Sequence, residues 1–289
     1  MGFKPSLHIV EGGVGKHLMF TCLLNKLVEK YKQKLCLMSG FPELFKHDSR
    51  IVQSHTHTIL PIHDYNYEMM RNYNEIIFKE PYKSNFLHGE KHLCDAWAEM
   101  YDIEIDSFLP DYVINVRREK EIHEEILKLG KFALVQFTGG QAHVTENYDE
   151  ENAGRNYRYG QEVVNLLKEE LPNLNIITFA QPNESEPLRN TTAFQNFGGI
   201  PKFVDKSDFM ILAGYCSSFI CIDSSLQHIC SNKRYHKKGV VLWGSSNPEQ
   251  FGYDKNVNLR SEYPYAPEIK PQKVVDAFLE QKVDTNATS

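Results

Sequence analysis

Two apolar runs that both end in small hydroxyl-bearing residues constrain this chain more than any other feature. Residues 219–222 and 240–243 are short apolar runs, the pattern of buried strands. The first run is followed by 223–225, Asp-Ser-Ser, which favours the start of a helix, and the second by 244–246, Gly-Ser-Ser. If the two strands are parallel neighbours, both loops reach the ligand-binding edge of an α/β sheet. Because a helix that starts there directs free N–H groups at the ligand, the pattern predicts an anion site.

The amino-terminal segment has a related pattern. Residues 7–10 predict a strand, and 11–17, Glu-Gly-Gly-Val-Gly-Lys-His, predict a glycine-rich turn. Apolar residues at helical spacing then predict a helix to about residue 31, and 35–38 predict a second strand. We therefore expect a βαβ unit whose glycine-rich turn brings the backbone close to a ligand.

The same turn is similar to the phosphate loop of partition-type ATPases. That chemistry needs a serine or threonine after the lysine, because its hydroxyl binds Mg²⁺. Here His17 follows Lys16, and imidazole prefers softer metals. A P-loop-like ATPase is therefore an alternative function and not the main prediction.

The remaining pattern alternates between strands and helices, which predicts an α/β protein. We expect strands at 58–62, 75–78, 111–116, 132–137 and 175–180, and helices at 88–101, 117–129, 158–171, 207–215 and 272–281. The expected domains are 1–120 and 121–283, followed by a disordered tail at 284–289.

Four segments, in order along the chain, resemble one family. Residues 223–228, Asp-Ser-Ser-Leu-Gln-His, and 239–248, Gly-Val-Val-Leu-Trp-Gly-Ser-Ser-Asn-Pro, resemble the Asp-Thr-Gly-Leu-x-His … Leu-Phe-Gly-Pro-Thr-x-Pro segment of heptosyltransferase-like sugar transferases, glycosyltransferase family nine. Residues 12–18 resemble the family's opening Gly-Gly-x-Gly-Asp, often followed by His-Leu, and 158–162 its Lys-Arg-Trp-Pro-x-Glu segment. Ser225 stands where the family usually has glycine. Lys16 stands where it has the aspartate thought to act in catalysis.

The resemblance implies a GT-B fold, in which two Rossmann-like domains face each other across a cleft. The first domain would bind the acceptor and the second the nucleotide-diphosphate sugar. No cofactor or metal is implied, and the chain has no Asp-x-Asp motif that would bind Mg²⁺. The donor-binding residues that we expect are Thr138, Gly139, Gly140, Arg158, Asp223, Ser224, Ser225, His228, Gly244, Ser245 and Ser246.

Transfer also needs a base that takes the proton of the acceptor hydroxyl. We expect His17 to act as this base, and Lys16 to neutralise the leaving diphosphate; the alternative is that Lys16, at the N-terminus of the helix, is itself the base. The acceptor-binding residues that we expect are Gly12, Gly13, Gly15, Lys233, Arg234, Lys237 and Lys238. Cations beside aromatic residues suit a phosphorylated glycan or a nucleic acid. Low arginine use is typical of AT-rich genomes, and a phage genome would be one example. Because certain phages glycosylate hydroxymethylated bases of DNA, such a base is the alternative acceptor.

Composition excludes several other classes of protein. A net charge of −6 argues against a surface covered by basic residues, and no apolar run approaches the roughly twenty residues of a membrane span. The start of the chain lacks a signal-peptide core, which favours the cytoplasm, or the host cytoplasm for a phage protein. The six cysteines form no CxxC pair, so we expect neither disulfides nor structural zinc.

The sequence thus predicts a metal-independent glycosyltransferase that moves a sugar from a nucleotide-diphosphate sugar to a hydroxyl. Whether the sugar is a hexose, a pentose or a heptose stays open. The alternatives are the ATPase and a protein with the transferase fold that binds ligands without activity.

Overall fold

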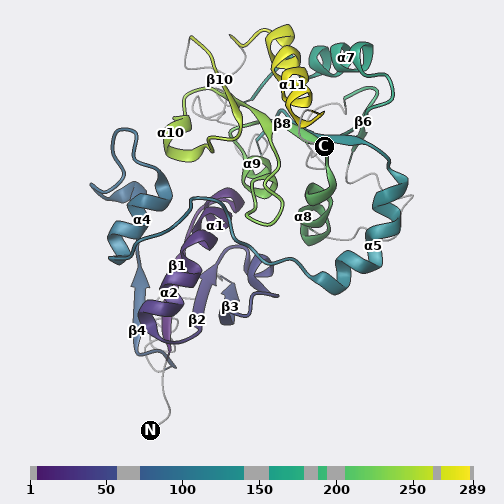
Figure 1. Cartoon of the computed structure of the whole chain (residues 1–289). Helices are drawn as coiled ribbons and strands as arrows, with labels where there is room; N and C mark the ends of the chain where they lie inside the picture. Colours follow the sequence, from purple (N-terminus) through teal and green to yellow (C-terminus); the bar gives the residue numbers. More distant parts are fainter. Residues whose placement is uncertain are drawn as a thin grey trace, which may run out of the picture. The chain divides into compact units, whose positions relative to one another are not determined.

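The computed structural model describes residues 5–56, 72–139, 156–178, 188–193, 206–262 and 268–286. The chain divides into two compact units, coloured mainly purple to blue and teal to yellow in Figure 1. The first comprises Met1–Asn115 with Asn232–Arg234, and the second comprises Val116–Ser231 with Tyr235–Ser289. The division falls at the start of helix α5 (Val116–Lys128), which also contains the boundary expected after residue 120.

In the first unit, the described residues form a sheet of four parallel strands in the order β3-β2-β1-β4. Its elements are β1 (Ser6–Val10), α1 (Val14–Phe20), the 3₁₀ turn η1 (Thr21–Leu23), α2 (Leu24–Tyr31), β2 (Leu35–Ser39), η2 (Pro42–Phe45), β3 (Ile51–Thr56), β4 (Glu75–Phe78), η3 (Pro81–Lys83) and α4 (Leu93–Tyr101). The strand order reverses between β1 and β4, because β2 and β3 extend the sheet on the other side of β1.

Two helices of this unit differ from the sequence prediction. The helix expected to run to residue 31 contains a 3₁₀ turn at Thr21, whose hydroxyl donates to the Leu18 carbonyl at 2.5 Å. The helix expected from residue 88 begins at Leu93, because the ring of His92 caps it by accepting the N–H of Cys94 at 3.2 Å. The expected strand at 58–62 lies outside the described residues.

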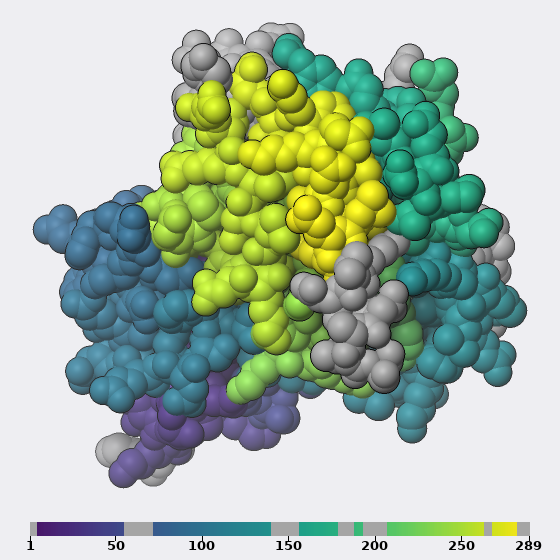
Figure 2. All heavy atoms as spheres, turned by 45° about the horizontal axis from the view of Figure 1, so that its top comes forward, coloured from purple at the N-terminus to yellow at the C-terminus, as the bar shows by residue number. Residues whose placement is uncertain are grey.

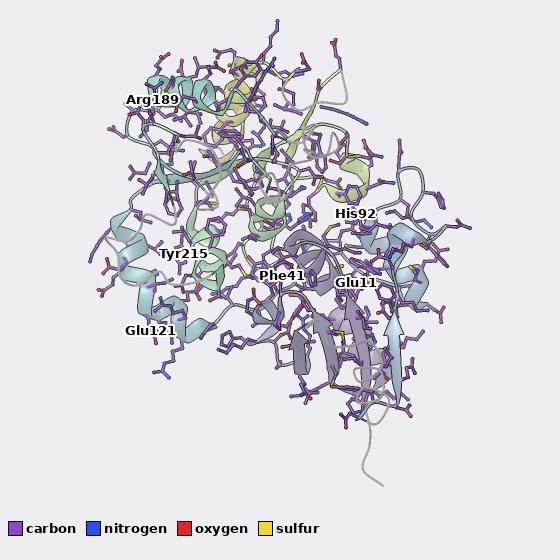
Figure 3. All side chains as sticks on the ribbon, turned by 180° about the vertical axis from the view of Figure 1, so that it is seen from behind. Glu11, Phe41, His92, Glu121, Arg189 and Tyr215 are labelled. Carbon is purple, nitrogen blue, oxygen red and sulfur yellow. The ribbon has the colours of Figure 1, made fainter. Side chains whose placement is uncertain are left out.

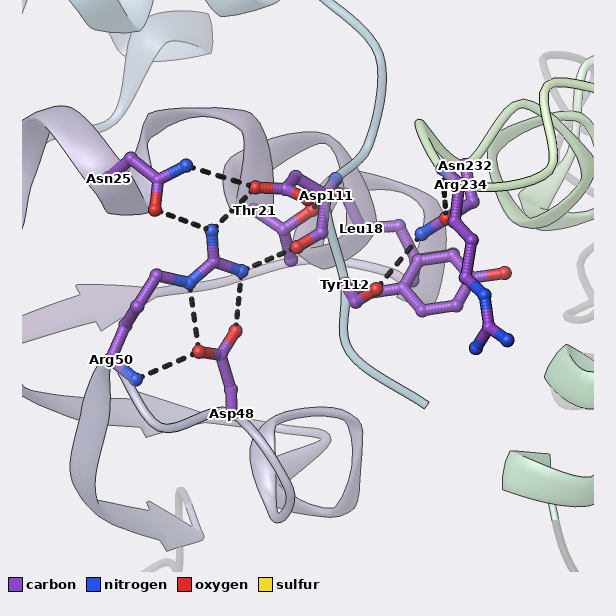
Figure 4. A network of polar contacts seen from close by, with 9 residues as sticks. All are labelled: Leu18, Thr21, Asn25, Asp48, Arg50, Asp111, Tyr112, Asn232 and Arg234. Atoms are coloured by element: carbon purple, nitrogen blue, oxygen red, sulfur yellow. Dashed lines mark hydrogen bonds and ion pairs between the residues drawn. The ribbon is translucent and has the colours of Figure 1, made fainter. Parts of the chain in front are cut away.

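The strand expected at 111–116 is not formed, because other partners take its backbone groups. The N–H of Asp111 donates to the Thr21 hydroxyl at 2.8 Å, and its carbonyl accepts from Arg50 at 2.5 Å. The carbonyl of Tyr112 accepts from the side chain of Asn232 at 3.0 Å (Figure 4). Arg50 organises this region with all five of its N–H donors, which go to Asp48, Asp111 and the side chain of Asn25.

In the second unit, six parallel strands of the described residues form a sheet in the order β10-β9-β8-β5-β6-β7. After α5, its elements are β5 (Phe132–Gln136), α7 (Gly160–Glu170), β6 (Asn175–Thr178), β7 (Thr192–Ala193), α8 (Lys206–Tyr215), β8 (Ser218–Ile222), α9 (Ser225–Cys230), β9 (Gly239–Trp243), α10 (Pro248–Phe251), β10 (Val257–Arg260) and α11 (Pro271–Asn286). The strand order reverses between β5 and β8.

Helices α7 and α11 pack together on this sheet, and Figure 2 shows the yellow atoms of α11 beside teal ones. The buried core beneath them includes Val163, Leu167, Val274 and Phe278. Helix α11 continues to Asn286 and so includes the first three residues of the tail expected at 284–289. In the described part of the chain, the helices are too short or too polar to cross a membrane, and all six cysteines are free thiols.

His8 on β1 yields a prediction about stability. Its side chain is fully buried, Nδ1 lies 3.3 Å from the Tyr101 hydroxyl, and burial lowers its pKa from 6.5 to about 4. Between these values the unfolded chain binds a proton on His8 that the folded protein does not bind. The free energy of unfolding should therefore decrease as the pH is lowered through this range, by about 1.4 kcal/mol per pH unit from this group.

Urea unfolding between pH 7 and pH 4 checks this prediction. His8→Gln, which keeps a polar partner for Tyr101, should show a slope smaller by one proton, whereas His47→Gln, at an exposed histidine, should keep the wild-type slope. Equal slopes in wild type and His8→Gln would contradict the prediction.

Candidate functional site

The carboxyl ends of three neighbouring strands form a candidate ligand-binding edge in the second unit. Gln136 at the end of β5 pairs with Cys221 on β8, and Ile222 on β8 pairs with Leu242 on β9. The segments that follow these strands, 137–139, 223–225 and 244–246, therefore lie along one edge. The strand order reverses between β5 and β8, and in open α/β sheets ligands bind at such a point. Thr138, Gly139, Asp223, Ser224 and Ser225 follow the two strands at this reversal, whereas Gly140 lies outside the described residues.

Side-chain hydrogen bonds hold these segments in place. The hydroxyl of Ser224 donates to the Gln136 side chain at 2.8 Å, which ties the end of β8 to the end of β5. The N–H of Gly139 donates to the Asn156 side chain at 2.8 Å, and Gln227 donates to the Asp223 carboxylate at 2.9 Å. A helix does begin in the segment 223–225, and Ser224 occupies the N-cap of α9, but its side chain makes no capping hydrogen bond.

Helix α9 is a weak source of positive charge at this edge. It has six residues, so few peptide dipoles add up at its N-terminus. His228 in this helix is buried, and its Nδ1 lies 2.7 Å from the Tyr253 hydroxyl. His228 therefore supports the loop from the core.

Arg158 supplies a positive charge beside the same edge. It is exposed and precedes α7, an 11-residue helix whose N-cap Tyr159 makes no capping hydrogen bond with its side chain. The guanidinium donates to the Tyr159 hydroxyl at 2.7 Å and lies 4.8 Å from the centre of that ring. The N–H of Tyr157 donates to the carbonyl of Phe137 at 2.8 Å, which anchors this segment to the end of β5. Arg158 is thus a partly oriented cation, suited to an anionic group.

Ser246 carries a buried hydroxyl without a hydrogen-bond partner among the described residues. Its side chain is 9% exposed, and among the described residues its Oγ has no hydrogen-bond partner. Gly244 is buried and Ser245 is exposed. Because a buried hydroxyl without a partner costs about 1–3 kcal/mol, an oxygen of a bound ligand would stabilise this position.

The first unit has its own edge, where β1 and β4 end side by side with Ile9 paired to Phe78. Figure 3 shows Glu11 and Phe41 at this end of the sheet. In the turn after β1, Gly12 has a φ of 103°, and a Cβ there would lie 2.9 Å from Lys16 Cδ. Position 12 therefore requires glycine, whereas Gly13 is the N-cap of α1 and Gly15 lies within that helix.

Lys16 is not directed at open solvent. Its Nζ lies 2.5 Å from Oε2 of Glu80, two residues after β4, and both side chains are about one-tenth exposed, at 9% and 10%. The ammonium also lies 4.7 Å from the centre of the Tyr82 ring and 5.7 Å from that of Trp97. Glu80 could not be identified from the sequence, because nothing in the local pattern around Lys16 marks a partner 64 positions away.

His17, expected to act as the base, is fully buried. Its Nδ1 lies 2.9 Å from the Gly13 carbonyl and its Nε2 lies 2.9 Å from the Val10 carbonyl. Burial lowers the pKa of this ring, although both carbonyl contacts act in the opposite direction. In this structure neither ring nitrogen can reach an acceptor hydroxyl, so His17 instead fixes the turn to the end of β1.

The expected basic cluster is divided between the two units. Lys233 and Arg234 belong to the first unit, where the N–H of Lys233 donates to the Pro110 carbonyl at 2.8 Å. Lys237 and Lys238 belong to the second unit. Neither unit by itself therefore presents all four cations. Across the described ranges, no group of three or more histidine, cysteine, aspartate or glutamate residues is arranged to hold a metal.

No protein-family model and no curated protein matches the chain. Solved structures do. ADP-heptose lipopolysaccharide heptosyltransferase II of E. coli is 11% identical, with a TM-score of 0.70 over 98% of this chain and 100% of that one. A family 9 glycosyl transferase from Veillonella parvula is 10% identical, with a TM-score of 0.67 over 98% of each chain.

A third solved structure, E. coli heptosyltransferase WaaC with ADP, is 11% identical, with a TM-score of 0.61 over 98% of this chain and 99% of that one. These likenesses extend over nearly the whole chain and both sheets. The predicted α/β fold and its resemblance to heptosyltransferase-like proteins are therefore confirmed at the level of the fold, which is of the GT-B type.

Proposed function

We propose that this protein is a glycosyltransferase that uses a nucleotide-diphosphate sugar as its donor. The observation that carries the proposal is the edge of the second sheet, where three strand ends bring small and hydroxyl-bearing segments together beside Arg158. The shared fold supports it, and one of the similar solved structures contains ADP. The second unit would bind the donor and the first unit the acceptor.

Each group at this edge suits one part of a nucleotide-diphosphate sugar. Arg158 would form a charge-assisted hydrogen bond with the diphosphate, and Ser245 and Ser246 would donate their hydroxyls to its oxygens. The carboxylate of Asp223, which accepts hydrogen bonds, suits hydroxyls of the ribose or the sugar better than phosphate. Arg158 and the hydroxyls would take the place of a metal ion in balancing the charge of the leaving diphosphate.

ADP should therefore stabilise the protein in the presence of EDTA, by mass action on the folded state. Arg158→Ala should weaken ADP binding about ten- to a hundredfold, the equivalent of about 1.5–3 kcal/mol for a hydrogen bond to a charged group. Isothermal titration calorimetry measures the affinity. Arg189→Ala, at another exposed arginine of the same unit, is the matched control and should bind ADP like wild type. Equal affinity of the two variants, or binding that requires Mg²⁺, would contradict the assignment.

Ser246 separates binding from stability. Ser246→Ala should leave the free energy of unfolding unchanged or raise it by up to about 1 kcal/mol, because the hydroxyl that is removed has no partner among the described residues. The same change should weaken ADP binding about three- to tenfold, since it removes one hydrogen bond of about 1 kcal/mol. Urea unfolding without ligand and calorimetry with ADP measure the two effects. A loss of stability with unchanged affinity would show that the hydroxyl serves the fold instead.

A further inference from the structure

We propose that Glu80 is the general base of the transfer, held in place by Lys16; this inference rests on the proposed function. Glu80 follows β4, and Lys16 lies in the first helix after β1. These two strands are the neighbours between which the order of the first sheet reverses. The carboxylate therefore stands at the edge where an open α/β sheet binds its ligand.

Two contacts fix the carboxylate and leave it able to bind a hydroxyl. Oε2 accepts from Lys16 Nζ at 2.5 Å, and Oε1 accepts from the N–H of Tyr82 at 3.1 Å. A carboxylate accepts about four hydrogen bonds, so one or two further donors can still be bound. The side chain keeps 10% of its surface exposed, which gives an acceptor hydroxyl access to it.

The surroundings of the pair suit a sugar-like acceptor. The ring of Tyr82 is 54% exposed, and the Lys16 ammonium lies 4.7 Å from its centre. An exposed aromatic ring next to a carboxylate offers an apolar face and a hydrogen-bond acceptor to one polyhydroxylated ligand. The indole N–H of Trp97 donates to the Lys79 carbonyl at 2.9 Å, which fixes the backbone just before Glu80.

His17 and Lys16, the two residues of the turn that the sequence singled out for catalysis, fit the role less well. His17 has both nitrogens against backbone carbonyls and is fully buried. Lys16 is an ammonium against a carboxylate, so it has no lone pair to offer while the pair is intact. Its fixed charge orients Glu80.

The proposed step transfers one proton and exchanges one bond for another. The acceptor hydroxyl gives its proton to Glu80 while its oxygen forms a bond to the anomeric carbon of the donor sugar. The bond between that carbon and the diphosphate oxygen breaks, and the nucleoside diphosphate leaves with the electron pair. Glu80 ends the step as a neutral carboxylic acid and returns its proton to solvent.

The test uses the full-length protein and measures release of nucleoside diphosphate from a panel of ADP-, UDP- and GDP-sugars, with water or added glycosides as acceptor. Glu80→Gln keeps the size of the side chain but removes the basic group, and its single amide oxygen can accept from only one of the two donors, Lys16 or Tyr82. Its kcat should fall about 10²- to 10⁴-fold, the usual range for loss of a general base, while the Kd of ADP stays within twofold of wild type. Glu99→Gln breaks another ion pair of the same unit, with Lys91, and should keep wild-type kcat.

Chemical rescue distinguishes a base from a structural residue. Glu80→Ala opens space beside Lys16 that sodium formate, a small carboxylate, can fill. Turnover of Glu80→Ala should rise at least tenfold as formate increases, whereas wild type and Glu99→Gln should not respond. Normal turnover of folded Glu80→Gln, or an inactive Glu80→Ala that formate does not rescue, would overturn the role of Glu80 alone. A wild-type protein that neither binds ADP nor releases a diphosphate from any sugar of the panel would overturn the proposed function, and this inference with it.

Discussion

The direction of the strands is the constraint on which both units depend. In a parallel sheet every strand ends at the same edge, so residues that follow different strands meet there although they are far apart in sequence. In the second unit this rule brings Thr138 near Asp223, and a hydrogen bond from Ser224 to Gln136 secures the junction. In the first unit it brings Glu80 to Lys16. Each candidate site follows from where the chain reverses the order of its strands.

Much of this arrangement could be predicted from the sequence, because strands buried on both faces have continuous apolar sequences. The runs at 219–222 and 240–243 became β8 and β9, and their hydroxyl-bearing ends lie along one edge. The strand expected at 111–116 was wrong for a physical reason. Its apolar residues could be recognised in the sequence. The side chains that donate hydrogen bonds to its carbonyls, Arg50 and Asn232, come from distant parts of the chain.

Side-chain roles were harder to predict than strand positions. Serine is a favoured N-cap residue, yet the hydroxyl of Ser224 donates to Gln136 instead of capping α9. This partner is available only because β5 lies next to β8. Histidine ordinarily has a pKa near neutrality, yet the turn places the His17 ring between two carbonyls in the core, where burial lowers its pKa. Burial and partners decide both roles, and neither is a property of the local sequence.

The charges of the two edges point to different ligands. In the first unit Lys16 and Glu80 compensate each other at 2.5 Å, so the pair adds no net charge and gives little attraction to a diphosphate. In the second unit Arg158 is exposed, and among the described residues it contacts the hydroxyl and the ring of Tyr159, neither of which carries a negative charge. An anion gains most at the second edge, whereas an uncharged hydroxyl gains most from the carboxylate at the first. This division of charge matches a donor that carries a diphosphate and an acceptor that reacts through a hydroxyl.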